Sequence, residues 1–235
     1  MAPTDFVALG LAWYVVFVFS VTVHEAAHAL LAMKLGDPTA YHGGQVTLDP
    51  VPHMRREPFG MIVVPLLSYV LGGWMFGWAS TPYDPGWAAR HPRRAAWMGL
   101  AGPGGNLALI LLAGVLIHAG IAAGWFYAPP AITFSTVVEA RAVGPAKAAA
   151  VLLSLLFSLN LLLLIFNLLP LPPLDGTAWM ELVLRGEALL RYRQLIAHPQ
   201  ARLVGLVLAW IFFDVVFGPV HHVAINLLYP GAGYH

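Results

Sequence analysis

Long runs of apolar residues, interrupted by short polar stretches, dominate the pattern along the chain. Five hydrophobic segments stand out, at residues 6–35, 58–80, 98–125, 146–169 and 203–228. Each is close to or longer than the ~20 residues that a helix needs to cross the hydrocarbon core of a bilayer. The pattern therefore predicts an all-α polytopic membrane protein, a helical bundle that forms a single membrane-embedded domain over residues 1–235.

Two weaker patterns predict elements between these segments. Residues 43–50 contain β-branched residues and are bounded by turn residues, which indicates a β-strand or a small hairpin. Residues 178–196 mix apolar and charged positions, so we expect an amphipathic helix at the membrane surface, broken at Gly186.

Composition agrees with a membrane protein and narrows its chemistry. Hydrophobic residues make up 59% of the chain and charged residues 10%, against roughly 25% charged residues in soluble domains. The net charge of +1, without any basic run, gives no reason to expect a nucleic-acid partner; the expected surroundings are the lipid bilayer. The chain has no cysteine, so a zinc site must use histidine and carboxylate ligands.

The first hydrophobic segment carries the motif His24-Glu-x-x-His28 near its end. Spacing of i and i+4 puts both imidazoles on one helical face, where they can bind a single metal ion. Glu25 then lies beside the ion and can take a proton from a metal-bound water. The alternative, two histidines that are merely packed in the bundle, leaves a carboxylate at membrane depth unexplained, since ionisable groups are costly there.

A proline-rich segment with a carboxylate follows the fourth hydrophobic segment, from Asn167 to Gly176. Three prolines in four residues end the helix and force extended backbone, so Asp175 lies on a rigid, non-helical segment. Two histidines, one carboxylate and a water form a catalytic zinc set with an open position. Asn160 and Asn167 are seven residues apart, hence on one helical face, which we expect to point at this site.

Together the two motifs resemble those of the site-2 protease family of intramembrane zinc metalloproteases. The third hydrophobic segment opens with Ala101-Gly-Pro-Gly-Gly-Asn106, which is similar to the Ala-Gly-Pro-x-x-Asn element of that family. Residues 44–53 also resemble the compact bacterial members, which lack an inserted PDZ domain. The resemblance covers about residues 20 to 180, the catalytic core.

This resemblance implies a role for each residue of the two principal motifs. His24, His28 and Asp175 would bind one Zn²⁺ per chain. Glu25 would be the general base that activates the water and then protonates the leaving amine. The substrates would be transmembrane segments of other proteins.

The resemblance also implies residues on the substrate side, with less specific support. Asn106 and Asn167 would steady the substrate carbonyl or the oxyanion, and the alternative for Asn106 is an interhelical hydrogen bond without chemistry. The strand that contains Gly44 and Val46 would pair with the backbone of an unwound substrate. His53 would orient substrate or a ligand; the alternative is a solvated loop histidine.

The two halves of the site must meet, and this constrains the topology. His28 lies at the end of the first segment and Asp175 follows the fourth, so five full crossings would leave them on opposite faces. Segment 58–80 is interrupted by Pro65 and by Gly72-Gly73, and we predict that it enters the membrane and returns as a re-entrant hairpin.

Charge asymmetry favours this topology. With the hairpin, ten of the twelve basic residues share one face, and only Arg141 and Lys147 lie opposite. The ten are Lys34, Arg55, Arg56, Arg90, Arg93, Arg94, Arg185, Arg191, Arg193 and Arg202. The positive-inside rule assigns that face to the cytoplasm. We therefore expect an integral protein of a prokaryotic inner or plasma membrane, with its catalytic motifs toward the cytoplasm.

Three functions remain to be compared. The leading one is an intramembrane zinc endopeptidase. A zinc transporter of the ZIP type also places His-Glu-x-x-His in a membrane helix, but it pairs that motif with a second His- and Asp-bearing helix, which this chain lacks. The third is an inactive relative that only binds membrane clients, and the intact set of His24, Glu25, His28 and Asp175 argues against it.

Overall fold

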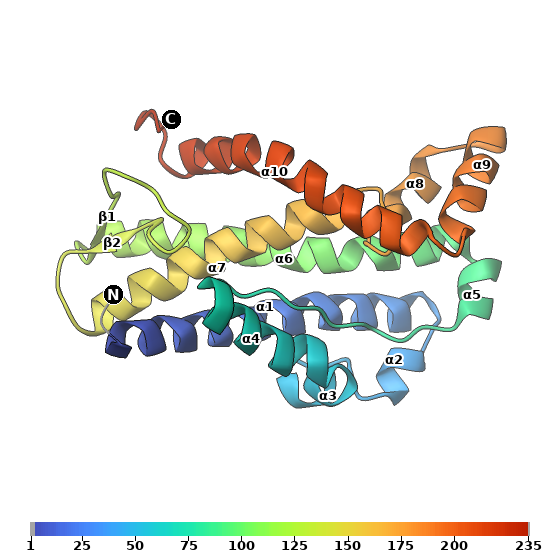
Figure 1. Cartoon of the computed structure of the whole chain (residues 1–235), viewed down its shortest axis with the longest axis horizontal. Helices are drawn as coiled ribbons and strands as arrows, with labels where there is room; N and C mark the ends of the chain where they lie inside the picture. The colour runs from blue at the N-terminus through green and yellow to red at the C-terminus, as the bar shows by residue number, and fades with distance from the viewer. Residues whose placement is uncertain (1–2, 235) are drawn as a thin grey trace.

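Three long helices form the centre of the fold. The computed structural model describes residues 3–234, apart from the side chains at positions 3 and 214. Helices α1 (Pro3–Leu35), α6 (Pro92–Ala122) and α7 (Pro145–Leu168) run along the long axis of the molecule (Figure 1). Among the described residues, these three helices are each long and apolar enough to cross a membrane. The predicted class, an all-α polytopic membrane protein, is confirmed.

A fourth long helix, α10 (Ala201–Leu228), packs on α7, and its last turns lie at the same end of the long axis as the start of α1 (Figure 1). Before it the chain forms α8 (Thr177–Val183) and α9 (Gly186–Ala197), and α9 meets the first part of α10 at 99°. Gly186 has a φ of +52°, a left-handed value that favours glycine, so the predicted break in the amphipathic stretch is confirmed.

Segment 58–80 forms a short helix and then turns back. A turn of π-helix, η1 (Phe59–Val63), continues into α4 (Val64–Gly72), which ends at Gly73 with a φ of +74°. Fourteen helical residues span only ~21 Å, less than the ~30 Å of a bilayer core. The chain then runs back beside the helix, where the Trp78 N–H donates to the Gly60 carbonyl at 3.1 Å. The predicted hairpin geometry is present; we call residues 74–84 the return segment.

The prediction of a strand at residues 43–50 is wrong. Helix α2 (Thr39–His42) ends in a turn, and irregular backbone leads from there to α3 (Pro50–Arg56). The Asp49 carboxylate accepts a hydrogen bond from Val51 N–H at 2.9 Å, so an N-cap followed by proline starts a helix here instead. The one sheet among the described residues pairs β1 (Phe126–Tyr127) with β2 (Glu139–Ala140), at the other end of the bundle.

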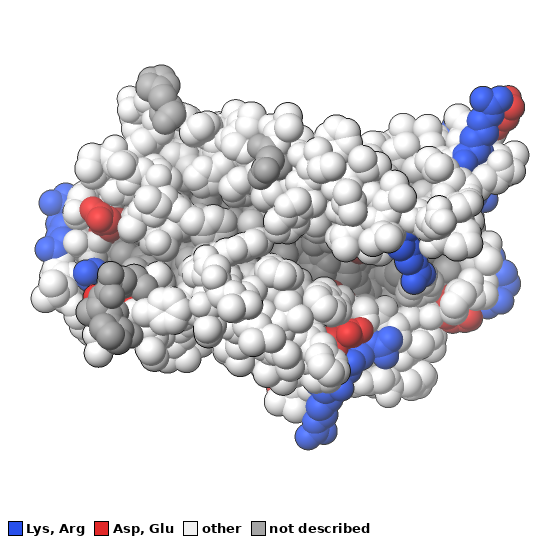
Figure 2. Space-filling model, in the orientation of Figure 1, with Lys and Arg blue, Asp and Glu red and all other residues white. Residues whose placement is uncertain are grey.

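The outside of the bundle is suited to lipid. Large apolar side chains point outward along the helices, such as Leu111 and Val115 of α6 and Leu203 of α10. Charged side chains gather toward the two ends of the long axis and around α3, and most of the face between them is uncharged (Figure 2). Acyl chains can solvate the apolar band while water solvates the charged ends, as a membrane-spanning bundle requires.

Candidate metal centre

Three side chains with metal-ligating atoms meet inside the bundle. His24 and His28 extend from adjacent turns of α1, and Asp175 extends from the irregular segment between α7 and α8. The two Nε2 atoms are 3.1 Å apart, and Asp175 Oδ2 lies 3.0 Å from His24 Nε2 and 3.2 Å from His28 Nε2. Both histidines are buried, whereas Asp175 is partly exposed. The meeting of the two motifs that the topology argument required is therefore present.

Two glycines make this close approach possible. A Cβ built at Gly102 of α6 would lie 2.2 Å from His28 Nε2 and 2.5 Å from His24 Nε2. A Cβ at Gly176 would lie 2.0 Å from the Leu169 carbonyl oxygen. Any larger residue would push α6 off the imidazoles or open the turn that carries Asp175, which gives Gly102 and Gly176 a packing reason.

Hydrogen bonds fix which ring nitrogen of each histidine is free. The Nδ1–H of His28 donates to the Met98 carbonyl at 2.7 Å, and a carbonyl can only accept. The Nδ1–H of His24 donates to Asn106 Oδ1, also at 2.7 Å. In its neutral form each ring therefore presents an Nε2 lone pair toward Asp175, which is the protonation state that a metal ligand needs.

The orientation of Asn106 is itself fixed by a chain of amides. Its Nδ2 donates to Asn160 Oδ1 at 2.8 Å, and Asn160 Nδ2 donates to the Leu156 carbonyl at 2.8 Å and to Ser20 Oγ at 2.9 Å. Because the Leu156 carbonyl is an obligate acceptor, every donor from there to His24 is determined. Asn106 and Asn160 are fully buried, so no water competes for these bonds.

The convergence of acceptors fits a divalent cation. When both rings are neutral with Nδ1 protonated, two imidazole lone pairs and a carboxylate oxygen face one another, which is repulsive unless a metal ion or a further proton lies among them. Ligand atoms of a tetrahedral Zn²⁺ lie roughly 3.3 Å apart, and the sides of this triangle are 3.0 to 3.2 Å. A His, His, Asp set leaves a fourth position for water or substrate, which is typical of catalytic zinc.

Glu25 lies beside this set and has a partner that sequence reasoning missed. Its side chain is 5% exposed, and its Oε2 accepts a hydrogen bond from Thr81 Oγ1 at 2.7 Å. Thr81 belongs to the return segment, 56 residues away in the chain. No sequence motif marks it, because the contact depends on where the hairpin returns.

The remaining predicted residues are less closely tied to the centre. Asn167 is partly exposed and makes no side-chain hydrogen bond with the described residues. Gly44 and Val46 lie in the irregular backbone before α3, without a strand. His53 is 1% exposed and donates from Nε2 to the Thr47 carbonyl at 3.1 Å, so the interpretation as a solvated loop residue is wrong.

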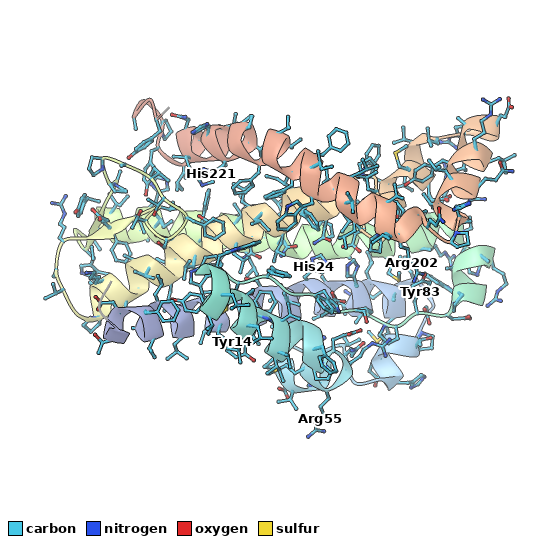
Figure 3. All side chains as sticks on the ribbon, viewed as in Figure 1. Tyr14, His24, Arg55, Tyr83, Arg202 and His221 are labelled. Carbon is cyan, nitrogen blue, oxygen red and sulfur yellow. The ribbon has the colours of Figure 1, made fainter. Side chains whose placement is uncertain are left out.

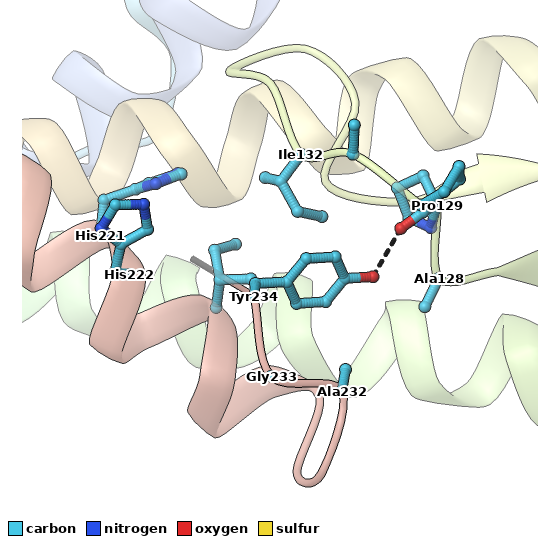
Figure 4. Close-up of a pocket in the computed structure, with 11 residues that line it drawn as sticks. Ala128, Pro129, Ile132, His221, His222, Ala232, Gly233 and Tyr234 are labelled. Carbon is cyan, nitrogen blue, oxygen red and sulfur yellow. Dashed lines mark hydrogen bonds between the residues drawn. The ribbon is translucent and has the colours of Figure 1, made fainter.

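A cavity of about 680 Å³ lies elsewhere in the molecule. It is lined by the end of α10, the loop after β1 and the C-terminal residues, with Tyr234 donating from its hydroxyl to the Pro129 carbonyl (Figure 4). His221, one of its lining residues, is well separated from His24 along the long axis (Figure 3). The cavity is therefore not part of the metal centre.

Fold and site together define a class: a multi-pass membrane protein with a buried His-Glu-x-x-His and Asp centre, the composition of a zinc metallopeptidase. Residues 12–212 match peptidase family M50, the site-2 protease family. The match covers most of the chain, and the chain belongs to this family. Zinc is accordingly the metal that His24, His28 and Asp175 fit.

Similar proteins carry the same designation. The chain is 34% identical over 171 residues to "Putative zinc metalloprotease YwhC" of Bacillus subtilis. The aligned residues cover 71% of this chain and 66% of YwhC. It is 31% identical over 205 residues to "Putative zinc metalloprotease Rip2" of Mycobacterium tuberculosis, covering 84% of this chain and 68% of Rip2. The chain thus spans about two thirds of the length of these relatives. No solved structure matches the chain.

Proposed function

We propose that this protein is an intramembrane zinc endopeptidase that hydrolyses peptide bonds in or near transmembrane segments of other proteins. The observation that carries the proposal is the buried triangle of His24, His28 and Asp175 within a bundle of membrane-length helices. Bound zinc would polarise the scissile carbonyl and make its water acidic enough to be deprotonated near neutral pH.

Glu25 would take that proton and pass it to the leaving amine. It follows His24 directly in α1, and its burial keeps bulk water from competing for the carboxylate. Asn106 is engaged at both ends of its amide, which supports a role in orienting His24 rather than in binding the oxyanion. The role of Asn167 at the substrate carbonyl stays a prediction.

The return segment is a better edge for substrate than residues 43–50. It runs extended from α4 toward α5 (Pro85–Arg90), and in extended backbone the N–H and C=O groups of successive residues point to opposite sides. Its even-numbered residues are bonded on one side: Phe76 N–H to Ser68 Oγ, Trp78 N–H to the Gly60 carbonyl, and the Ser80 carbonyl to Arg56 Nε.

The odd-numbered residues of this segment have no such bonds to the described residues. Among the described residues, the backbone groups of Met75, Gly77 and Ala79 have no hydrogen-bond partner. The molecular surface is hollowed on the face between α10 and the return segment (Figure 2). A transmembrane helix must be unwound before a peptide bond is accessible, and pairing the unwound strand here would satisfy its freed backbone groups.

The proposal includes an orientation of the protein in which the metal centre lies toward the cytoplasm. The metal ligands lie in the part of the bundle that also carries α5 and α9, and the helices and helix ends of that part hold most of the basic residues. The positive-inside rule then assigns the centre to the cytoplasmic half of a prokaryotic plasma membrane.

A Glu25→Gln variant tests the function. The purified parent and variant should bind equal amounts of zinc, because Glu25 is not a ligand, and only the parent should cleave a helix-destabilised transmembrane peptide in detergent or vesicles. A chelator should abolish cleavage by the parent, and added zinc should restore it. Zinc flux into vesicles that survives the Glu25→Gln change, without any proteolysis, would instead establish a carrier.

A further inference from the structure

A hydroxyl from outside both metal-binding motifs contacts the proposed base. Thr81 Oγ1 donates to Glu25 Oε2 at 2.7 Å and lies 3.0 Å from the Glu25 carbonyl oxygen. We propose that Thr81 is a positioning residue, which holds one oxygen of Glu25 so that the other faces the water. This inference rests on the proposed protease function.

The chemistry of a carboxylate beside a metal explains why positioning is needed. With a metal bound, two equivalent oxygens would allow Glu25 to turn toward the open metal position and displace the water that it is proposed to deprotonate. A short O–H···O⁻ bond is among the stronger hydrogen bonds of proteins and holds one oxygen in place. At 5% exposure, little water reaches Glu25 to replace a lost donor.

Beside Thr81, the return segment is also bound to the end of α3. The neighbouring Ser80 donates from Oγ to Glu57 Oε1 at 2.5 Å, and its carbonyl accepts from Arg56 Nε at 3.1 Å. Pro82 restricts the backbone that follows. The orientation of Glu25 therefore depends on the return segment being seated against α3.

This arrangement links the proposed substrate edge to the base. Met75, Gly77 and Ala79 carry the backbone groups that have no partner among the described residues, and Thr81 continues the same odd-numbered series to Glu25. A displaced return segment would lose both the substrate edge and the donor to Glu25. The base is thus expected to be held in place only while the segment is seated.

Two substitutions separate the hydroxyl from the shape of the side chain. Thr81→Val keeps the branched shape and removes the donor, whereas Thr81→Ser keeps the donor. We expect Thr81→Val to lower kcat roughly 10- to 100-fold with KM within about twofold, because a misplaced catalytic group acts on the chemical step. Thr81→Ser should recover most of kcat. Bound zinc and the melting temperature should stay at parental values in both.

A merely structural contact would give another outcome. Equal kcat for the parent and Thr81→Val would overturn the inference, as would a loss that Thr81→Ser fails to rescue. A loss that tracks reduced zinc content or a lower melting temperature would also overturn it, because the hydroxyl would then be stabilising the fold.

A spectroscopic double-mutant cycle provides a test that does not depend on activity. In the Co²⁺-substituted protein, Thr81→Val should alter the visible absorption bands if Glu25 moves toward the metal, and Thr81→Ser should not. In the Glu25→Gln background the same Thr81→Val change should have no effect. If Thr81→Val leaves the spectrum unchanged in the protein that retains Glu25, the positioning role is refuted. A parent that binds metal but cleaves nothing refutes the protease function instead, and the spectra still decide the role of Thr81.

Discussion

Asn160 lies two hydrogen bonds away from His24, yet it determines which nitrogen of that histidine is free. The chain begins at the Leu156 carbonyl, passes through the amides of Asn160 and Asn106, and ends at His24 Nδ1. Partners beyond the ligands orient a metal site because a ligand in the wrong tautomer presents a proton to the ion instead of a lone pair. The site is therefore built from α1, α6 and α7 together.

Removal of this relay should weaken metal binding without unfolding the bundle. We expect Asn160→Leu to lower zinc affinity roughly 10- to 100-fold, measured by competition with a chelator. Ser158→Ala is the matched control, because Ser158 is buried on the same helix and its hydroxyl has no partner among the described residues. Equal zinc affinity of the parent and Asn160→Leu would refute the relay.

At the scale of elements, the contact between the end of α1 and the return segment depends on one carboxylate. Asp37 is 1% exposed; its Oδ1 accepts hydrogen bonds from the N–H and hydroxyl of Thr39, and its Oδ2 accepts from Asp84 N–H at 2.8 Å. Burial alone would raise the pKa of Asp37, but these hydrogen bonds outweigh it and lower the pKa below its ordinary value.

The sign of this shift predicts how stability changes with pH. A lowered folded-state pKa means that Asp37 stabilises the fold above its unfolded pKa of ~3.9 and that the contribution is lost as pH falls through the folded value. We expect Asp37→Asn to cost about 1–3 kcal/mol at pH 7, since one acceptor becomes a donor facing an N–H. The difference from the parent should shrink toward pH 3. Melting temperatures across this range measure it, with the exposed Glu187→Gln as control.

At the scale of the whole molecule, the hairpin decides the topology. Three membrane-length helices and α10 give four crossings if α4 and the return segment enter and leave on one side. The metal ligands of α1 and of the segment after α7 then reach the same half of the bilayer.

Single cysteines test this arrangement on a background that has none. Arg55→Cys and Arg90→Cys should react with an impermeant maleimide from the same side of sealed vesicles, and Val143→Cys, at an 86% exposed position before α7, from the other. Labelling of positions 55 and 90 from opposite sides would mean that segment 58–80 crosses the membrane.

Much of this protein can be predicted from the chain alone, where the deciding physics is local. Hydrophobic length predicts the long helices, because a bilayer core demands it, and the i, i+4 spacing of His24 and His28 follows from helical periodicity. The approach of Asp175 follows from the requirement that the two motifs meet, and Gly186 breaks the surface helix because of its own backbone freedom.

Other features depend on contacts between distant segments, which only the tertiary structure decides. The predicted strand at residues 43–50 is too short to show a clear alternating pattern, and the N-cap formed by Asp49 starts helix α3 at its end instead. Thr81 reaches Glu25 only because of where the return segment lies, and Asn160 reaches Asn106 only because α6 and α7 pack together. The ligand types are thus determined by local sequence, and their protonation and alignment by packing between helices that are far apart in the chain.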